Sequence, residues 1–227
     1  IKAHCDDRGG VIASADSSIY NCGRDYYSYV WPRDAMYALN PLLSLGYTDE
    51  VKKFLEFMIP LIHPRGYVHH KYSPDSAPGS TWHPLVQNGK PELNIQEDET
   101  ASIVRLAIDY IGSTQDVGFH TKLLKKIIIP CTNFMAKHID EETGLPHASY
   151  DLWEQVFLTN TYTTSIVYST LLKAKEQVAK IMPEFDTSLW ASSATRIEQN
   201  IGKLFDEKKQ WFVRGLQPGF HDYEQEQ

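Results

Sequence analysis

Cysteine is scarce in this chain, and no segment stays apolar for long. The three cysteines, Cys5, Cys22 and Cys131, form no CxxC pair or other metal-binding pattern, and their odd number argues against a complete disulfide framework. No apolar run approaches the roughly 18 residues that a membrane-spanning helix needs. These absences disfavour a disulfide-rich domain, a cysteine-based metal domain and a membrane protein.

Basic residues are also few, with 22 Lys and Arg against 29 Asp and Glu, for a formal net charge of −7. Nucleic acids and anionic membrane surfaces select for basic patches, so we expect neither as the main partner. The adjacent pair His69-His70 has no acidic residue at helical spacing, so we expect no metal there, and no cofactor elsewhere.

The start of the 227-residue chain is polar and lacks both an initiator methionine and an apolar signal sequence. We therefore expect a segment of a longer protein. The compartment stays open, with a slight preference for the cytoplasm. Hydrophobic residues make up 42% of the chain, which is enough for a packed core.

Helical periodicity is the main pattern that is present. Apolar residues recur at helical spacing over 34–45, 48–59, 98–111, 118–138, 161–181 and 184–205, with a kink or break expected at Pro41 and Pro130. Gly46 is placed to end the first of these helices, and Thr48 to begin the second. Residues 210–214 are expected as a short strand, and no parallel-sheet pattern is seen. The sequence predicts an all-α fold of about six helices.

Two long loops interrupt these helices. Residues 63–95 are rich in proline and glycine but also carry aromatic side chains such as Tyr67, Tyr72 and Trp82. Loops of more than about 15 residues in a compact domain are usually functional or disordered, and the aromatic content disfavours disorder. Residues 140–150 form the second loop.

Two clusters place charged residues beside large aromatic rings. They are Tyr27-Ser28-Tyr29-Val30-Trp31-Pro32-Arg33-Asp34 and Tyr150-Asp151-Leu152-Trp153-Glu154. Unpaired charges are costly to bury, and a carboxyl group beside an indole keeps its proton to higher pH. A sugar has apolar ring faces and polar edges, so aromatic platforms with a few fixed charges indicate carbohydrate chemistry.

At these clusters the chain resembles the glucoamylase-type glycoside hydrolases of family 15, in particular the prokaryotic and archaeal branch. Four segments carry the resemblance, in the same order and spacing, between about residue 20 and residue 215. They are YSYVWPRD at 27–34, STWHP at 80–84, IQEDETA at 95–101 and GLPHASYDLWE at 144–154.

The resemblance implies an (α/α)6 toroid, in which six inner helices are ringed by six outer ones. About six of the twelve helices are expected here. Residues 1–227 are thus predicted as a partial catalytic domain, with an irregular or extended lead-in at 1–30, helices and pocket loops at 31–205 and a tail at 206–227.

A partial toroid is expected to leave an apolar edge. The candidates for incomplete packing there are Met36, Leu39, Phe54, Leu171 and Leu172. The partner of this edge is expected to be the remaining half of the toroid, or a second copy through self-association.

Family members hydrolyse α-glucosidic bonds from non-reducing ends with inversion, which requires a general acid and a general base. The resemblance assigns the acid to Glu154, with Trp153 and its loop shielding it from water. The alternative is a surface glutamate that follows a core Leu-Trp pair. The base is a glutamate of the second half in this family, and no acidic residue after Glu154 is assigned to it. We therefore expect very low hydrolysis by this chain alone.

The resemblance also implies sugar-binding residues. Arg33 and Asp34 match the pair that grips the terminal glucose, although a salt bridge at a helix start is the alternative. Tyr27 and Trp31 match an aromatic wall beside that glucose, and they would otherwise be core residues.

Further residues are expected around this pair. Gln96, Asp98 and Glu99 are predicted to bind sugar or to support the groups that do, unless they only form an acidic helix N-terminus. Trp82, with His83, floors the entrance loop or is structural. Gln155 stands where many fungal members carry a glutamate, which leaves the second subsite and the chain-length preference open.

Three kinds of function remain. The first is a glucan exo-hydrolase, whose scaffold also carries trehalase and glucodextranase specificities, with an α-glucan as its partner. The second is a non-catalytic, glucan-binding or regulatory member, because phosphorylase kinase regulatory subunits carry a similar domain. The third is a helical scaffold with incidental motifs. Glu154, Arg33 and Asp34 together favour an enzyme lineage.

Overall fold

Helices dominate the computed structural model, which describes residues 2–14, 27–81, 86–87, 90–91, 93–217 and 225–226. The helices of these residues are α1 (Pro32–Ser44), α2 (Thr48–Met58), α3 (Glu97–Ser113), α4 (Val117–Leu123), α5 (Ile129–Lys137), α6 (Thr161–Ile181) and α7 (Ser188–Asn200). A π-helical segment, Leu124–Ile128, joins α4 to α5 without a break. Short 3-10 segments cover Lys2–His4, Ile59–Leu61 and Ile201–Leu204. The all-α prediction is confirmed.

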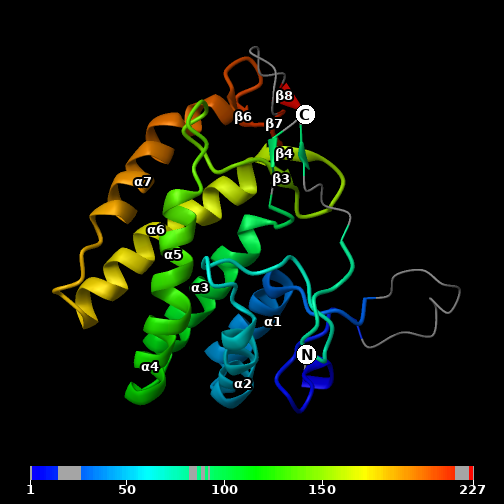
Figure 1. Ribbon diagram of the computed structural model, residues 1–227, viewed down its shortest axis with the longest axis vertical. Coiled ribbons are helices and arrows are strands. Elements are labelled where there is room, and N and C mark those ends of the chain that lie inside the picture. Colours follow the sequence, from blue (N-terminus) through cyan, green and yellow to red (C-terminus); the bar gives the residue numbers. More distant parts are fainter. Residues whose placement is uncertain are drawn as a thin grey trace, which may run out of the picture.

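The strands of the described residues are short, and every pairing between them is antiparallel. One sheet has the order β3-β4-β7-β8, with β3 at Ser149–Tyr150, β4 at Phe157–Asn160, β7 at Gly215–Leu216 and β8 at Gln225–Glu226. Two hairpins complete the set: β1 (Val86–Gln87) with β2 (Lys90–Pro91), and β5 (Phe205–Asp206) with β6 (Trp211–Phe212). Because β4 leads directly into α6, the four-stranded sheet anchors the start of that helix (Figure 1).

The helices form two rows. In the inner row α3 packs between α1 and α6. In the outer row α2 packs on α1 and α3, α5 on α3 and α6, and α7 on α5 and α6 (Figure 1). Each inner helix is followed in the chain by an outer helix, so the unit is a helical hairpin that repeats around the row.

The hydrophobic core lies between the two rows. Leu39, Ile103 and Leu171 from the inner helices and Phe54 from α2 are all 0% exposed. Each such side chain contributes about 1.5–3 kcal/mol by leaving water. Trp190 of α7 is also fully buried, and its indole N–H donates to Asn133 of α5 at 2.7 Å, so its one polar atom is satisfied.

Three helices differ in detail from the sequence expectation. Within 118–138 the α-helix is interrupted by the π-helical segment that directly precedes Pro130. Because the helix continues through this segment, Pro130 lies inside it, and the π-helical turn is the local irregularity that accompanies its missing N–H. Pro41 does not break α1, whose last residue is Ser44. The chain then turns away at Gly46, which has a left-handed φ of 86°. The helix expected from 184 begins at Ser188, because the Asp186 carboxylate accepts the Ser188 N–H at 2.9 Å and forms a turn there.

The expectation of an incompletely packed apolar edge was wrong for four of its five residues. Met36 is 4% exposed and Leu39, Phe54 and Leu171 are 0% exposed, whereas Leu172 is 40% exposed. The four face the space between the rows, where both rows cover them. Pairing with further helices, or self-association, stays a prediction.

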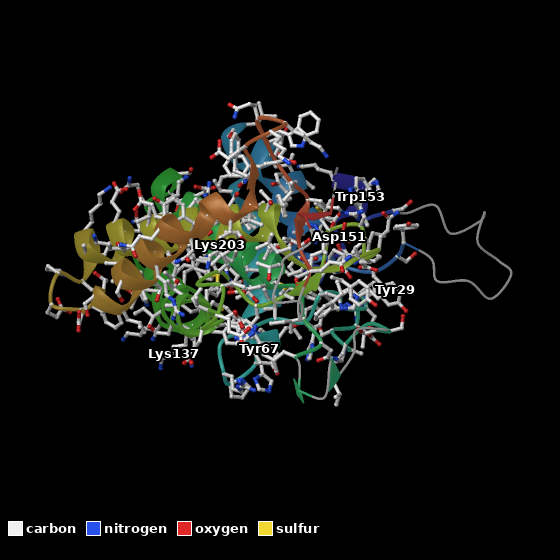
Figure 2. The ribbon with its side chains drawn as sticks, turned by 90° about the horizontal axis from the view of Figure 1, so that it is seen from above. Tyr29, Tyr67, Lys137, Asp151, Trp153 and Lys203 are labelled. Carbon is white, nitrogen blue, oxygen red and sulfur yellow. The ribbon has the colours of Figure 1, made fainter. Side chains whose placement is uncertain are left out.

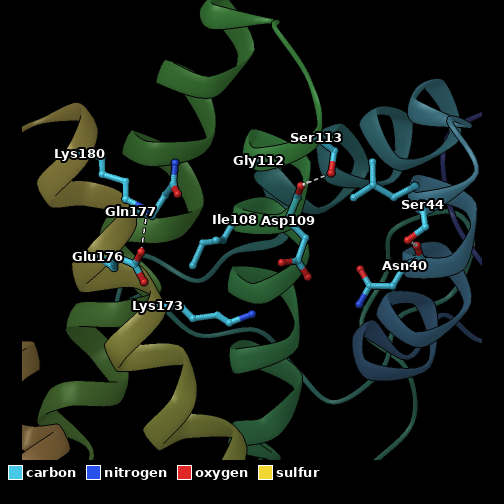
Figure 3. A pocket seen from close by; sticks show the side chains of 11 residues that line it. Asn40, Ser44, Ile108, Asp109, Gly112, Ser113, Lys173, Glu176, Gln177 and Lys180 are labelled. Atoms are coloured by element: carbon cyan, nitrogen blue, oxygen red, sulfur yellow. Dashed lines mark hydrogen bonds and ion pairs between the residues drawn. The ribbon is translucent and has the colours of Figure 1, made fainter.

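A polar cleft of about 600 Å³ lies at the C-terminal end of the inner row (Figure 3). It is lined from all three inner helices, by Asn40 and Ser44 of α1, Asp109 of α3, and Lys173 and Glu176 of α6. The inner helices therefore run parallel. None of the described helices is both long and apolar enough to cross a bilayer.

Adjacent leucines on α6 test this core. We expect Leu171→Ala to lower the free energy of unfolding by about 2–5 kcal/mol, because it removes packed methyl groups and leaves a cavity. Leu172→Ala, the matched control on the exposed side, is expected to cost less than about 1 kcal/mol. Urea unfolding followed by circular dichroism measures both, and equal losses would contradict the packing described here.

Candidate active site

The N-termini of the three inner helices meet at one end of the molecule. Arg33, in the first turn of α1, contacts Gln96 and Asp98 at the start of α3. Tyr162, the second residue of α6, lies with its hydroxyl oxygen 3.1 Å from that of Tyr37 on α1. Helix N-termini present unpaired N–H groups and partial positive charge, so this end favours anionic and polar groups.

Arg33 is the centre of a buried polar cluster. Its Nη1 donates to Gln96 Oε1 at 2.8 Å and to Asp98 Oδ2 at 2.7 Å. The same nitrogen lies 3.1 Å from Glu99 Oε1. The Arg33 backbone N–H donates to Glu99 Oε2 at 2.5 Å, which satisfies an otherwise unpaired donor in the first turn of α1. Glu99 thus caps α1 from a neighbouring helix.

The protonation of this cluster is perturbed by burial. Burial alone would lower the pKa of Arg33, but the neighbouring Glu99 and Asp98 outweigh it and raise the pKa. Burial raises the pKa of Glu99 well above its usual range, although Arg33 opposes the change. Burial, with a contribution from Asp98, does the same to Glu97, whose carboxyl oxygens have no hydrogen-bond partner among the described residues. Glu97 and Glu99 therefore retain their protons to a higher pH than exposed carboxyl groups would.

Asp151 builds the turn that presents Glu154. Its Oδ1 accepts the backbone N–H groups of Gln155 at 2.9 Å and Val156 at 3.2 Å, and its carbonyl accepts the N–H of Glu154 at 2.8 Å. Arg214 pairs with the same carboxylate; burial alone would raise the pKa of Asp151, but this pairing and the turn's hydrogen bonds lower it. Glu154 itself has φ 57°, a left-handed conformation that is uncommon outside glycine and concentrates at functional sites.

Glu154 lies beside an indole and several ionisable side chains. Its Oε1 accepts the Trp31 indole N–H at 3.2 Å and lies 3.8 Å from His70 Nε2. Burial raises its pKa, while the Trp31 hydrogen bond and the charges of Lys71 and Arg33 oppose the rise. A carboxyl group that keeps its proton to a higher pH is what general acid catalysis requires.

The two clusters seen in the sequence come together through Arg33. Its Nη2 lies 3.5 Å from Asp34 Oδ2 and 3.4 Å from the carbonyl oxygen of Leu152, two residues before Glu154. The Asp34 side chain remains 50% exposed; burial of the rest raises its pKa, and Arg33 opposes this. Asp34 is thus open to a ligand, while most of Arg33 is committed to the protein.

Aromatic rings border this region. The Tyr27 and Trp31 ring centroids are 5.8 Å apart with an interplanar angle of 34°, and Tyr29 meets Trp31 edge-on, also at 5.8 Å. Trp31 is buried and Tyr27 is about half-exposed. The Tyr27 ring thus forms the solvent-exposed edge of this aromatic group.

Trp153 differs from the expectation. It was expected to shield Glu154, but it is 71% exposed, and Trp31 with the surrounding burial takes that place. Trp153 lines a separate pocket of about 370 Å³ with Gln155, Tyr162 and Arg214. In Figure 2, Trp153 and Asp151 lie toward the Tyr29 side of the molecule, away from Lys137.

Some of the predicted sugar-binding residues are buried and cannot contact a ligand directly. Gln96, Asp98 and Glu99 are 0% exposed, so they support Arg33. Trp82 and His83 lie outside the described residues. No group of three or more potential metal ligands occurs in the part of the chain that the structure describes.

Three residues near the site were not predicted to lie there: His70 and Lys71, which approach Glu154, and Arg214, which holds its turn. His70 was considered from the sequence only for metal binding, as one of an adjacent histidine pair. The only signal for the first two was their place in a loop rich in aromatic residues. Arg214 gave no local signal, because its role depends on the pairing of β7 with β4.

Comparison with known proteins is consistent with this geometry. The model of "Glycosyl hydrolases family 15" matches residues 2–226. Trehalase 2 of Sulfolobus acidocaldarius is 24% identical over 215 residues, covering 85% of this chain and 36% of that protein. Glucoamylase 1 of Rhizopus oryzae is 24% identical over 219 residues, covering 89% of this chain and 34% of that protein. The chain thus spans about a third of the length of these curated relatives.

Among solved structures, the glucoamylase from Saccharomycopsis fibuligera superimposes with a TM-score of 0.72 at 18% identity, covering 92% of this chain and 46% of that one. This likeness identifies the two rows of helices as part of an (α/α)6 toroid. Since the family match extends over nearly the whole sequence, this chain belongs to the glycosyl hydrolases of family 15.

Proposed function

We propose that this chain provides the sugar-gripping and proton-donating part of an inverting, exo-acting glucan hydrolase of glucoamylase type. Such an enzyme releases glucose from the non-reducing ends of α-glucans. The observation that carries the proposal is the placement of Glu154, a largely buried carboxyl group with a raised pKa, beside Trp31 and the Arg33–Asp34 pair.

The residues divide into those that touch sugar and those that hold them. Glu154 protonates the leaving oxygen, Tyr27 and Trp31 cover a ring face, and Asp34 accepts hydrogen bonds from hydroxyl groups. Arg33 fixes Asp34 and the Leu152 carbonyl and is itself fixed by the start of α3.

A second set of residues is proposed for the next sugar. Trp153 and Gln155 line the neighbouring pocket with Arg214. Trp82, which lies outside the described residues, is assigned to this set from the sequence resemblance alone. Gln155 is neutral and its Oε1 accepts from Arg214 at 3.2 Å, so this subsite discriminates by hydrogen bonding rather than by charge.

The general base is proposed to lie outside the described residues. An inverting enzyme holds its two carboxyl groups roughly 6.5–9.5 Å apart, so that a water molecule fits between the base and the sugar. The charges that act most on Glu154 come from Lys71, Arg33 and Asp34, all of which precede it in the chain. None of these is a candidate base from the later part of the sequence.

Two alternatives have specific support. A trehalase specificity is favoured by the relative of that name. A glucan-binding role without turnover is favoured by the absence of an assigned base. A panel of maltotetraose, trehalose and isomaltose separates the first from the glucan hydrolase, and binding without glucose release identifies the second.

Binding tests the role of Asp34. We expect Asp34→Asn to weaken binding of acarbose about tenfold or more, since a charge-assisted hydrogen bond of about 1.5–3 kcal/mol is lost. Asp109→Asn, the same change in the cleft at the opposite end of the inner row, is expected to leave the dissociation constant unchanged. Isothermal titration calorimetry measures both. Equal affinity of wild type and Asp34→Asn would remove Asp34 from the binding site.

Turnover tests the role of Glu154. This chain is expected to release glucose from maltotetraose far more slowly than the roughly 1–1000 per second of ordinary enzymes. Glu154→Gln should reduce the remaining rate by about 10²–10⁴, the usual contribution of a general acid. Glucose release is followed enzymatically, and the anomer is identified by NMR. Ordinary turnover by the wild-type chain would place a base within it, and an unaffected Glu154→Gln variant would exclude Glu154 as the acid.

The hydrogen bond from Trp31 tests how Glu154 is tuned. The indole N–H favours the carboxylate, so Trp31→Phe should raise the pKa of Glu154 by about half a unit to one unit, equivalent to about 1 kcal/mol. ¹³C NMR of labelled glutamate carboxyl groups measures this, with Glu154→Gln identifying the signal. Trp211→Phe, which changes an exposed tryptophan of β6, is the control that should leave the titration unmoved. A lower pKa in Trp31→Phe would contradict the contact.

A further inference from the structure

Lys71 is a lysine buried in the protein interior. The residue is 1% exposed, although lysine is almost never fully buried unless its charge is paired. Its stem is held by Gly79: a Cβ at Gly79 would stand 2.5 Å from Lys71 Cγ, and the Gly79 N–H donates to the Lys71 carbonyl at 3.0 Å. The glycine is needed for this close approach, so the side chain has a defined position.

Backbone pairing directs this side chain to the aromatic wall. Tyr72 exchanges both backbone hydrogen bonds with Val30, at 2.7 and 2.9 Å, and is bridged to Pro78 on its other side. Residues that flank a directly paired couple share one face of the ladder. Accordingly, Lys71 Nζ lies 4.6 Å from the ring centroid of Tyr29 and 5.4 Å from that of Trp31. These are cation–π distances.

The same wall holds the proposed acid. Trp31 is both a ring beneath the Lys71 ammonium and the hydrogen-bond donor to Glu154. The ionisable groups around Glu154 are His70 and Lys71 from this segment and Arg33 and Asp34 from α1. After Trp31, Lys71 is the strongest influence that favours the charged form of Glu154.

We propose that Lys71 is a positioning residue of the glycosidase site, whose ammonium fixes the Trp31 indole against Glu154 and offsets the negative charge that Glu154 acquires when it gives up its proton. The inference rests on the proposed function. In that reaction the bond from C1 to the leaving oxygen breaks, its electron pair stays on the oxygen, and Glu154 supplies the proton. Water forms the new bond to C1 and gives its proton to a carboxylate base. The anion left at position 154 is what Lys71 stabilises.

A titration without substrate tests this directly. Lys71→Met removes the charge and keeps the stem, so the pKa of Glu154 should rise by about half a unit or more. Lys71→Arg keeps the charge and is the matched control, expected to stay close to wild type. Glutamate ¹³C NMR gives the titration midpoints, and the Trp31 indole N–H resonance should shift in Lys71→Met but not in Lys71→Arg.

A second variant covers a failure of Lys71→Met to fold. Gly79→Ala keeps every charge but pushes on the lysine stem, and it should move the Glu154 midpoint in the same direction by a smaller amount. Circular dichroism confirms folding of each variant. A Glu154 midpoint that is the same in wild type and in the folded variants would overturn the inference.

Catalysis separates positioning from sugar contact. In the active protein, Lys71→Met should lower kcat, leave KM nearly unchanged and move the alkaline limb of the pH profile upward, because the acid holds its proton longer. A raised KM with an unmoved limb would instead make Lys71 a sugar contact and overturn the positioning role. The titration stands independently: a chain that neither binds nor cleaves glucans ends the proposed function, yet still reports whether Lys71 controls Glu154.

Discussion

A single buried guanidinium organises this half of the toroid. Arg33 is nearly inaccessible to water, and an unpaired charge in such a place would be prohibitively costly. Its cost is offset by Gln96 and Asp98, while Glu99 receives the backbone N–H that α1 leaves open. The starts of α1 and α3 are thereby locked in register. The second guanidinium nitrogen, Nη2, lies near Asp34 and the Leu152 carbonyl. The same side chain therefore fixes the Asp34 carboxylate relative to the turn that carries Glu154.

Glu154 illustrates how the site depends on distant segments. Asp151 forms the turn that carries Glu154, and Arg214 pairs with Asp151. Arg214 follows α6 and α7 in the sequence, so a residue distant along the chain supports the Glu154 turn. Trp31 and Lys71 approach from the paired segments around Val30 and Tyr72. Opposing effects act on the Glu154 carboxyl group. Burial favours its protonated form, whereas the Trp31 hydrogen bond and the nearby charges of Lys71 and Arg33 favour its anion. A group poised between the two can donate a proton and then bear the charge.

Comparison of particular elements shows how far local pattern carries. The helix over 161–181 has the bounds that its apolar periodicity predicts, since one face of α6 is buried along its whole length. The π-helical segment of 124–128 was not predicted; the sequence indicated only a kink or break at Pro130, two residues after it. Glu154, Arg33 and Asp34 were predicted to share a sugar-binding site; Arg33 contacts Asp34 and the Leu152 carbonyl, and the charges of Arg33 and Asp34 act on Glu154, while their roles toward sugar stay predictions. Trp153 was expected to shield Glu154 but is exposed and lines a neighbouring pocket, which the local sequence does not reveal. Lys71 and Arg214 were not predicted, because the role of a charged residue depends on which groups lie beside it in the fold.

The sequence by itself determined the helical class, the main helix positions and the two aromatic, charged clusters, because these depend on periodicity and residue type within short windows. Only the tertiary structure decided which carboxyl groups are buried, which cations face them and which tryptophan contacts the acid. Those outcomes depend on desolvation and on charges brought within a few ångströms by helices α1, α3 and α6, and such distances are not encoded in any single segment. The arrangement of this site therefore depends on the starts of α1 and α3 together with the loop segments that carry Glu154, Trp31 and Lys71.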